Sequence, residues 1–223
     1  MPVAPLRSPD WRHFTGPQPY SPVIDAMRAH VGFIRHTGAP EAIWLLEHTP
    51  VYTGGTSARP TDLLTPADVP TITVGRGGQW TWHGPGQRVV YVMLDLAKRG
   101  QDVRALVNAL EGWIIACLAD FGIAGDRRSG LPGIWVATGN SLSGYDKVAA
   151  IGIRISRWVS WHGLTINLDP DLTAFDAIVP CGITDGGVTS LARLGVTTSM
   201  AALDASLMRH FETFFPPTIT DTG

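Results

Sequence analysis

The stretch Lys147-Val148-Ala149-Ala150-Ile151-Gly152-Ile153-Arg154-Ile155-Ser156 is followed, four residues later, by Trp161-His162-Gly163-Leu164-Thr165-Ile166-Asn167-Leu168. Both runs are rich in β-branched and apolar residues, which favours two strands. The four residues between them are too few for a helical crossover, so the two strands should pair antiparallel.

Further short β-rich segments surround this pair and outnumber the expected helices. Because several of them adjoin through short turns, we expect an α+β fold (an α/β sandwich) in which helices pack on a mixed, largely antiparallel sheet. A doubly wound dinucleotide-binding fold is not expected. The further segments are residues 43–47, 69–74, 79–83, 88–96, 133–137 and 187–191.

Three amphipathic helices are expected from apolar residues at helical spacing. The first follows Ser21 and stops at Gly38, the second is capped by Asp102, and the third begins near Ser199. The proline-rich ends, residues 1–20 and 216–223, are expected to form an N-terminal arm and a C-terminal tail. One domain should therefore occupy residues 21–215.

Composition limits the classes of function. The chain has 223 residues, of which 44% are hydrophobic, which is enough for one domain with a sizeable core. The net charge of −2 gives no field for nucleic acid, and no apolar run approaches the roughly 20 residues of a membrane span. With two cysteines in different elements and no secretory segment, a cytoplasmic protein without disulfides is expected.

The two cysteines differ in their surroundings. Cys181 lies in Pro180-Cys181-Gly182-Ile183, among turn formers, which suits a reactive thiol. Cys117 lies on the apolar face of the second helix, where a thiol serves as a small hydrophobe.

Glycines flank a short strand in the segment from Arg76 to Gln87. They could let the backbone approach a ligand closely, or simply form the tight ends of a hairpin. The segment lacks the spacing of a phosphate-binding loop and of a dinucleotide fingerprint, so no nucleotide cofactor is expected.

Lys147 shares the apolar face of its strand with Ile151 and Ile153. It could extend from the strand end to solvent, or it could be a partly desolvated amine with a chemical role. His162 could be a core residue or a ligand. His83, His162 and Cys181 lack the close spacing of a zinc site, so no metal is expected.

Four segments, taken in their order along the chain, resemble the lipoyl(octanoyl) transferase family. They are the segment from Arg76 to Gln87, the strand opened by Lys147, Trp161-His162-Gly163-Leu164 with Asn167, and Pro180-Cys181-Gly182-Ile183. The resemblance implies a fold similar to the catalytic domain of biotin and lipoate protein ligases. It also implies transfer of an octanoyl group from octanoyl-acyl carrier protein to a lysine of lipoyl domains, without a cofactor. The implied acceptors are 2-oxoacid dehydrogenase acyltransferase subunits and the glycine cleavage H protein, and we expect a monomer.

The resemblance also implies roles for particular residues. Cys181 would be the nucleophile that carries the acyl thioester, and Lys147 would lower its pKa and act as general acid and base. The residues implied to bind the substrate are Arg76, Gly77, Gly78, Gln79, Trp80, Thr81, Trp82, His83, Ala150, Ile151, Gly152, Gly163, Leu164 and Thr165.

Other functions stay open on the sequence alone. An ATP-dependent lipoate or biotin ligase of the same fold would need no cysteine. A thioester hydrolase could pair Cys181 with His83 or His162. In a binding module, Cys181 would be structural. Since acyl carrier proteins are acidic, Arg154 and Arg157 are expected to form a docking patch.

Overall fold

The strands β9 (Tyr145–Ser156) and β10 (Val159–Asn167) form an antiparallel hairpin, as the opening stretch predicts. The computed structural model describes residues 8–179 and 186–217. Arg157 and Trp158 join the two strands, and both have positive φ, 46° and 67°. Two residues with positive φ are what the favoured two-residue hairpin turn needs, because its twist matches that of the strands.

The hairpin lies inside an eight-stranded main sheet, and a second sheet has three strands. The prediction of a mixed, largely antiparallel sheet is confirmed, since only the β1–β2 and β11–β9 pairs of the main sheet are parallel. The main sheet runs in the order β1 (Asp10–Gln18), β2 (Ala42–His48), β6 (Gln87–Met93), β10, β9, β8 (Leu131–Ala137), β7 (Asp126–Arg128), with β11 (Gly187–Val188) paired to β9; the small sheet runs β4 (Thr71–Thr73), β3 (Val51–Gly54), β5 (Trp80–His83).

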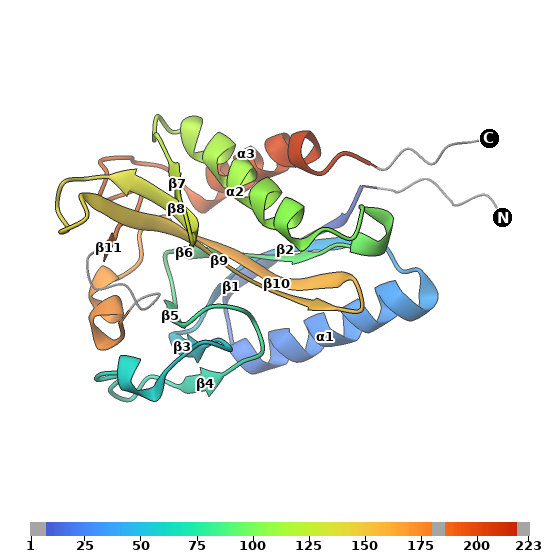
Figure 1. Cartoon of the computed structure of the whole chain (residues 1–223), viewed down its shortest axis with the longest axis horizontal. Helices are drawn as coiled ribbons and strands as arrows, with labels where there is room; N and C mark the ends of the chain where they lie inside the picture. Colours follow the sequence, from blue (N-terminus) through green and yellow to red (C-terminus); the bar gives the residue numbers. More distant parts are fainter. Residues whose placement is uncertain (1–7, 180–185, 218–223) are drawn as a thin grey trace.

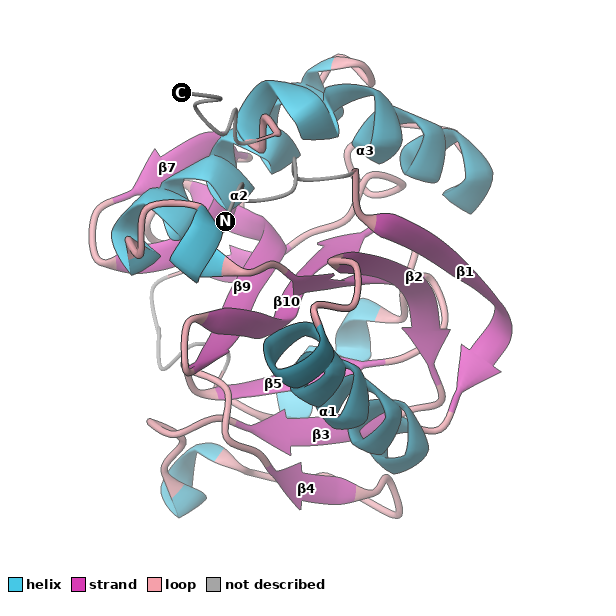
Figure 2. Ribbon diagram, turned by 90° about the vertical axis from the view of Figure 1, so that its right-hand side faces the viewer, coloured by secondary structure: helices cyan, strands magenta, loops and turns pink. Residues whose placement is uncertain are grey.

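Helices cover both faces of the main sheet (Figure 1). The helices α2 (Val103–Ala119) and α3 (Met200–Phe214) pack together on one face, over a core that contains Trp113 and Leu207. The helix α1 (Tyr20–Thr37) packs on the other face, over Trp44 and Trp161. Figure 2 shows the small sheet beside α1, on the same side of the main sheet. Tyr20 and the β5 residues of the site lie on this side, whereas Val107 of α2 lines the site from the other.

Short side chains define the helix starts by bonding to free backbone amides. Asp102 accepts hydrogen bonds from the amides of Arg104 and Ala105, and Ser199 accepts one from Ala202, so both predicted caps are confirmed. The predicted cap at Ser21 is wrong: α1 begins at Tyr20, and Pro19 holds the cap position without a side-chain bond. Gly38 ends α1 at φ 69°, as predicted.

The predicted N-terminal arm needs correction. Residues 10–18 form β1, which pairs parallel with β2, so the folded domain begins well before residue 21. The strand was hidden because it is an edge strand that buries little apolar surface, and because a register shift between His13 and Pro17 interrupts its alternation. The short strands β3 and β7 were also missed.

Candidate active site

A cavity of about 370 Å³ lies between the main sheet and the glycine-rich segment that begins at Arg76. Its size is that of a small-molecule site. Lys147 and all predicted substrate-binding residues except Trp82 line it, although they come from four separate segments of the chain. Further lining residues that were not predicted as substrate-binding are Tyr20, Ser57, Val89, Tyr91, Val107, Gly130, Leu131, Pro132, Ile153 and His162.

Trp82 faces away from the cavity. Side chains alternate along β5, so Thr81 and His83 point into the cavity while Trp82 packs edge-on against Phe175, with ring centroids 5.7 Å apart. Trp80 lines the cavity, and its indole nitrogen donates a hydrogen bond to the Arg59 carbonyl at 2.8 Å. Trp80 and Trp82 share one face of β5 and pack in the same apolar cluster, and only Trp80, at the start of the strand, also reaches the cavity lining.

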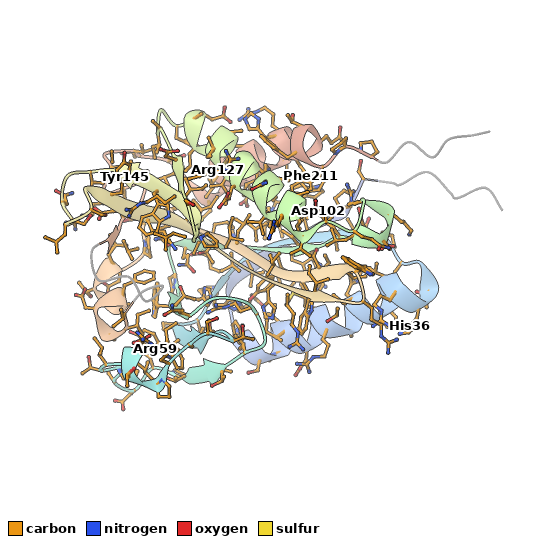
Figure 3. The ribbon with its side chains drawn as sticks, viewed as in Figure 1. His36, Arg59, Asp102, Arg127, Tyr145 and Phe211 are labelled. Carbon is orange, nitrogen blue, oxygen red and sulfur yellow. The ribbon has the colours of Figure 1, made fainter. Side chains whose placement is uncertain are left out.

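Lys147 is buried, with 7% of its surface exposed, so the interpretation of a side chain that reaches out to solvent is wrong. Its Nζ donates a hydrogen bond to the Pro132 carbonyl at 3.0 Å and lies 4.7 Å from the centre of the Trp135 ring. A carbonyl oxygen and an aromatic face both favour a positive charge. In Figure 3, Tyr145, which is two residues before Lys147, lies at one side of the molecule, and His36, in the last turn of α1, lies at the other.

Cys181 lies outside the residues that the structure describes. The chain resumes at residue 186, and Gly187 and Val188 pair with Asp146 and Lys147. Cys117, as predicted, is a buried residue of α2. Burial raises the pKa of its thiol to about 11, which makes it inert.

The glycine-rich segment is held tightly against β9. The Gly77 amide donates to the Ile153 carbonyl at 2.9 Å, and the Arg76 guanidinium donates to the carbonyl and hydroxyl oxygens of Thr53 at 2.7 and 2.8 Å. A Cβ added to Gly152 would lie 3.0 Å from the Arg76 side chain. A side chain at residue 152 would therefore crowd the segment, because the segment and the strand approach closely.

A chain of hydrogen bonds with defined directions links the cavity to β11. Nδ1 of His83 donates to the Gln87 carboxamide oxygen at 2.8 Å, because the Gln87 Nε2 donates to Asn167 Oδ1 at 2.9 Å. The Asn167 Nδ2 then donates to the Thr189 carbonyl at 3.0 Å, and the Thr189 amide donates to the Lys147 carbonyl at 2.9 Å. Asn167 therefore anchors the segment that follows residue 185 beside Lys147.

The directions also determine the tautomer of His83. Since Nδ1 carries the proton, Nε2 accepts the hydroxyl hydrogen of Thr53 across 3.3 Å. Burial, together with the nearby His48 and Arg76, holds the pKa of His83 well below its ordinary value. His83 is thus a neutral residue with both ring nitrogens engaged.

Neutral aromatic and imidazole groups gather near His83. His48 Nδ1 donates to the Gln18 carbonyl at 2.9 Å, so its Nε2 accepts from the Tyr91 hydroxyl at 2.7 Å. Burial lowers the pKa of His48 to about 4 and, with Arg76 beside it, that of His162 to about 3. Burial raises the pKa of Tyr20 to about 12.

His162 has φ 59°, an unusual conformation for a residue with a side chain, and such strain concentrates at functional sites.

Among the described residues, no three His, Cys, Asp or Glu side chains form a group that could hold a metal ion. In the same residues, no helix has the length and apolar character to cross a membrane.

Tyr20 and Val107 could not be recognised as site residues from the sequence. Each lies in a helix whose pattern reports only core packing, and each reaches the cavity because the helix docks against the sheet. His162 carried one signal, the adjacent Gly163, whose Cβ would overlap the Val90 carbonyl oxygen.

Solved structures share this fold. The bipartite lipoate protein ligase of Thermoplasma acidophilum matches with a TM-score of 0.73 at 12% identity, over 93% of this chain and 84% of the other. A lipoate-protein ligase A bound with ATP matches with a TM-score of 0.67 at 14% identity, over 92% of this chain and 85% of the other. The biotin protein ligase of Aquifex aeolicus with biotin and ATP matches with a TM-score of 0.55 at 12% identity, over 92% of this chain and 69% of the other. The predicted likeness to the ligase fold is confirmed.

Sequence relatives are much closer. An octanoyltransferase of Cereibacter sphaeroides is 54% identical over 213 residues, which cover 93% of this chain and 98% of the relative. One from Nitrobacter hamburgensis is 53% identical over 220 residues, which cover 97% and 91%. The model of the lipoyl protein ligase A/B catalytic domain matches residues 24–212. The chain therefore belongs to the octanoyltransferase family within the lipoyl protein ligase A/B catalytic domains, and it is an acyltransferase.

Proposed function

We propose that the chain transfers octanoyl from octanoyl-acyl carrier protein to the target lysine of lipoyl domains through a thioester on Cys181. One observation carries the proposal: a single cavity collects nearly all the pocket residues implied by the family resemblance and places the buried Lys147 on its wall. The apolar residues Ile151 and Leu164 on the same wall suit a saturated chain.

In the first step, the Cys181 thiolate attacks the thioester carbon of the donor. The bond from this carbon to the carrier sulfur breaks, the bond to the Cys181 sulfur forms, and the Lys147 ammonium gives its proton to the departing thiolate. A free thiol has a pKa of about 8.5, so a neighbouring ammonium would raise the fraction of thiolate at neutral pH.

In the second step, the acceptor amine attacks the acyl carbon on Cys181. The carbon–sulfur bond breaks, an amide forms, and the neutral Lys147 takes the proton that the amine loses. The Cys181 thiolate and the Lys147 ammonium are then restored together. The Pro132 carbonyl and the Trp135 ring stabilise the Lys147 ammonium of the free enzyme. The Gly77 amide is bonded to Ile153, so it is not a donor to the oxyanion.

Intact mass spectrometry of the protein after incubation with octanoyl-acyl carrier protein tests the proposal. We expect an octanoyl adduct on the wild type, loss of the adduct in Cys181→Ser, and slower formation in Lys147→Met. Lys98→Met is the matched control, because Lys98 lies in an exposed ion pair with Asp95. An unmodified wild type, or an adduct that persists in Cys181→Ser, contradicts the role of Cys181.

The same assay separates the alternatives. A hydrolase would release octanoate without an acceptor protein, and a ligase would acylate the acceptor from ATP and free octanoate in Cys181→Ser. His83 is a poor base for a hydrolase, because both of its ring nitrogens are already hydrogen-bonded.

We place the reaction in the cytoplasm, where Cys181 would stay reduced, and propose that the chain acts as a monomer. The proposed acceptors are the lipoyl domains of 2-oxoacid dehydrogenase acyltransferase subunits and the glycine cleavage H protein. Arg154 and Arg157, both exposed at the hairpin end of β9, are proposed to meet the acidic carrier protein.

A further inference from the structure

One peptide unit connects Lys147 to a buried carboxylate of α2. The Pro132 carbonyl accepts the hydrogen bond of the Lys147 Nζ at 3.0 Å, and the Gly133 amide, which belongs to the same peptide unit, donates to Oε1 of Glu111 at 3.3 Å. A trans peptide is planar, and its carbonyl and amide point in opposite directions. Glu111 and Lys147 therefore lie at the two ends of one peptide unit, at the wall of the cavity that Pro132 and Lys147 line.

Glu111 is a charged residue on the buried face of α2, with 7% of its surface exposed. Burying a carboxylate costs free energy unless hydrogen bonds and opposite charge compensate. Its Oε2 accepts from Nε of Arg127 at 3.1 Å, but the Arg127 side chain is 48% exposed, and ion pairs open to solvent contribute little stability. An ion pair of this kind could form at the surface, whereas only a carboxylate inside the fold reaches the buried Gly133 amide.

The peptide unit between Pro132 and Gly133 precedes the part of β8 that pairs with β9, which begins at Ile134. The ladder to β9 therefore does not fix its orientation. Gly133 has φ 117°, and an added Cβ would lie 2.5 Å from the Ala149 carbonyl oxygen. Because glycine allows the backbone to turn at low cost, a bonding partner is needed to keep the Pro132 carbonyl directed at Lys147.

We infer that Glu111 is a positioning residue for Lys147. By holding the Gly133 amide, its carboxylate keeps the Pro132 carbonyl directed into the cavity, and this carbonyl holds the Lys147 Nζ. Hydrogen bonds in series polarise one another, so the carboxylate also makes the carbonyl a stronger acceptor. The inference rests on the proposed function, in which Lys147 gives and takes the protons of the transfer, and it names the residue that holds Lys147 in place.

Two substitutions of Glu111 separate this role from that of the ion pair. Glu111→Gln removes the charge but keeps an oxygen at the same reach, so it can still accept from the Gly133 amide. Glu111→Asp keeps the charge but is shorter by one carbon–carbon bond of about 1.5 Å, so it withdraws from the amide, while the half-exposed Arg127 can follow it. A positioning role makes Glu111→Asp the slower variant, and a role limited to the ion pair makes Glu111→Gln the slower one.

The assay follows the octanoyl adduct on Cys181 by intact mass over a range of octanoyl-acyl carrier protein concentrations, which gives a maximal rate and a half-saturating concentration. We expect Glu111→Asp to lower the maximal rate about tenfold, equivalent to about 1.4 kcal/mol, with little change in the half-saturating concentration. Glu111→Gln should stay within about threefold of the wild type. In a Lys147→Met background, Glu111→Asp should cause no further loss, because its effect passes through Lys147.

Arg127→Met is the matched control, because it removes the ion pair and leaves the bond from the Gly133 amide to Glu111 in place. Its maximal rate should equal that of the wild type, at a temperature where circular dichroism shows every variant folded. The inference is overturned if Glu111→Gln slows acylation as much as Glu111→Asp, if neither slows it, or if Arg127→Met slows it equally. A wild type that forms no octanoyl adduct would instead contradict the proposed function.

Discussion

Replacing Gly163 by alanine should destabilise the protein strongly, because β6 and β10 approach each other closely at this position. An added Cβ would overlap the Val90 carbonyl oxygen and lie 3.1 and 3.2 Å from the carbonyl carbon of Val90 and the Cα of Tyr91. These are backbone atoms of a central strand, so relief requires separating β6 from β10, where Gly163 is paired with Tyr91. Overpacking of this kind costs about 3 kcal/mol, somewhat offset by the lower entropy of the unfolded alanine variant.

Gly32→Ala is the matched control for this prediction. Gly32 lies inside α1, has no atom within 4 Å of an added Cβ, and has no unusual φ. The same substitution should therefore stabilise the protein by about 0.5–1 kcal/mol.

Urea denaturation and thermal melting, both followed by circular dichroism, measure the stability of both variants. For a chain of this size, a loss of about 3 kcal/mol lowers the melting temperature by about 6–12 °C. A loss of less than about 1 kcal/mol in Gly163→Ala would refute the reasoning, as would a comparable loss in Gly32→Ala.

Three further predictions concern pH, positioning and docking. His48 and His162 have folded pKa values of about 4 and about 3, below the unfolded value of about 6.5, so the unfolded state binds more protons in acid. Stability should fall by up to about 1.4 kcal/mol per pH unit for each histidine as the pH drops below about 6.5, and His48→Gln should reduce this slope in urea titrations. Asn167→Asp keeps an acceptor for Gln87 but cannot donate to the Thr189 carbonyl, so kcat should fall at least tenfold with KM for the carrier little changed; a change in KM alone would argue against positioning. Arg154→Glu should raise KM for octanoyl-acyl carrier protein several-fold at low salt, and an equal KM at low and high salt would exclude this docking contact.

Local sequence signals predicted most elements because the signals act over a few residues. Asp102 and Ser199 cap the helices through neighbouring amides, and the four residues before Trp161 allow only a hairpin. The strand β1 escaped because its pairing partner β2 is distant in sequence and because an edge strand buries only part of one face.

The pocket was predicted only in part, and the errors have physical causes. Trp82 was assigned by its place in a motif, but the two-residue period of β5 turns it away from the cavity. Tyr20 and Val107 reach the cavity through helix docking, which leaves no mark in the periodicity of their helices.

The sequence by itself determined the class of fold, the caps of α2 and α3, the burial of Cys117 and the family to which the motifs belong. These follow from short-range propensity, from apolar period and from ordered motifs. Tertiary structure alone decided that Lys147 bonds to Pro132 instead of solvent, that His83 carries its proton on Nδ1, and that Tyr20 and Val107 line the cavity. Each of these depends on atoms from strands or helices far apart in the chain, and only packing brings such atoms within hydrogen-bonding distance.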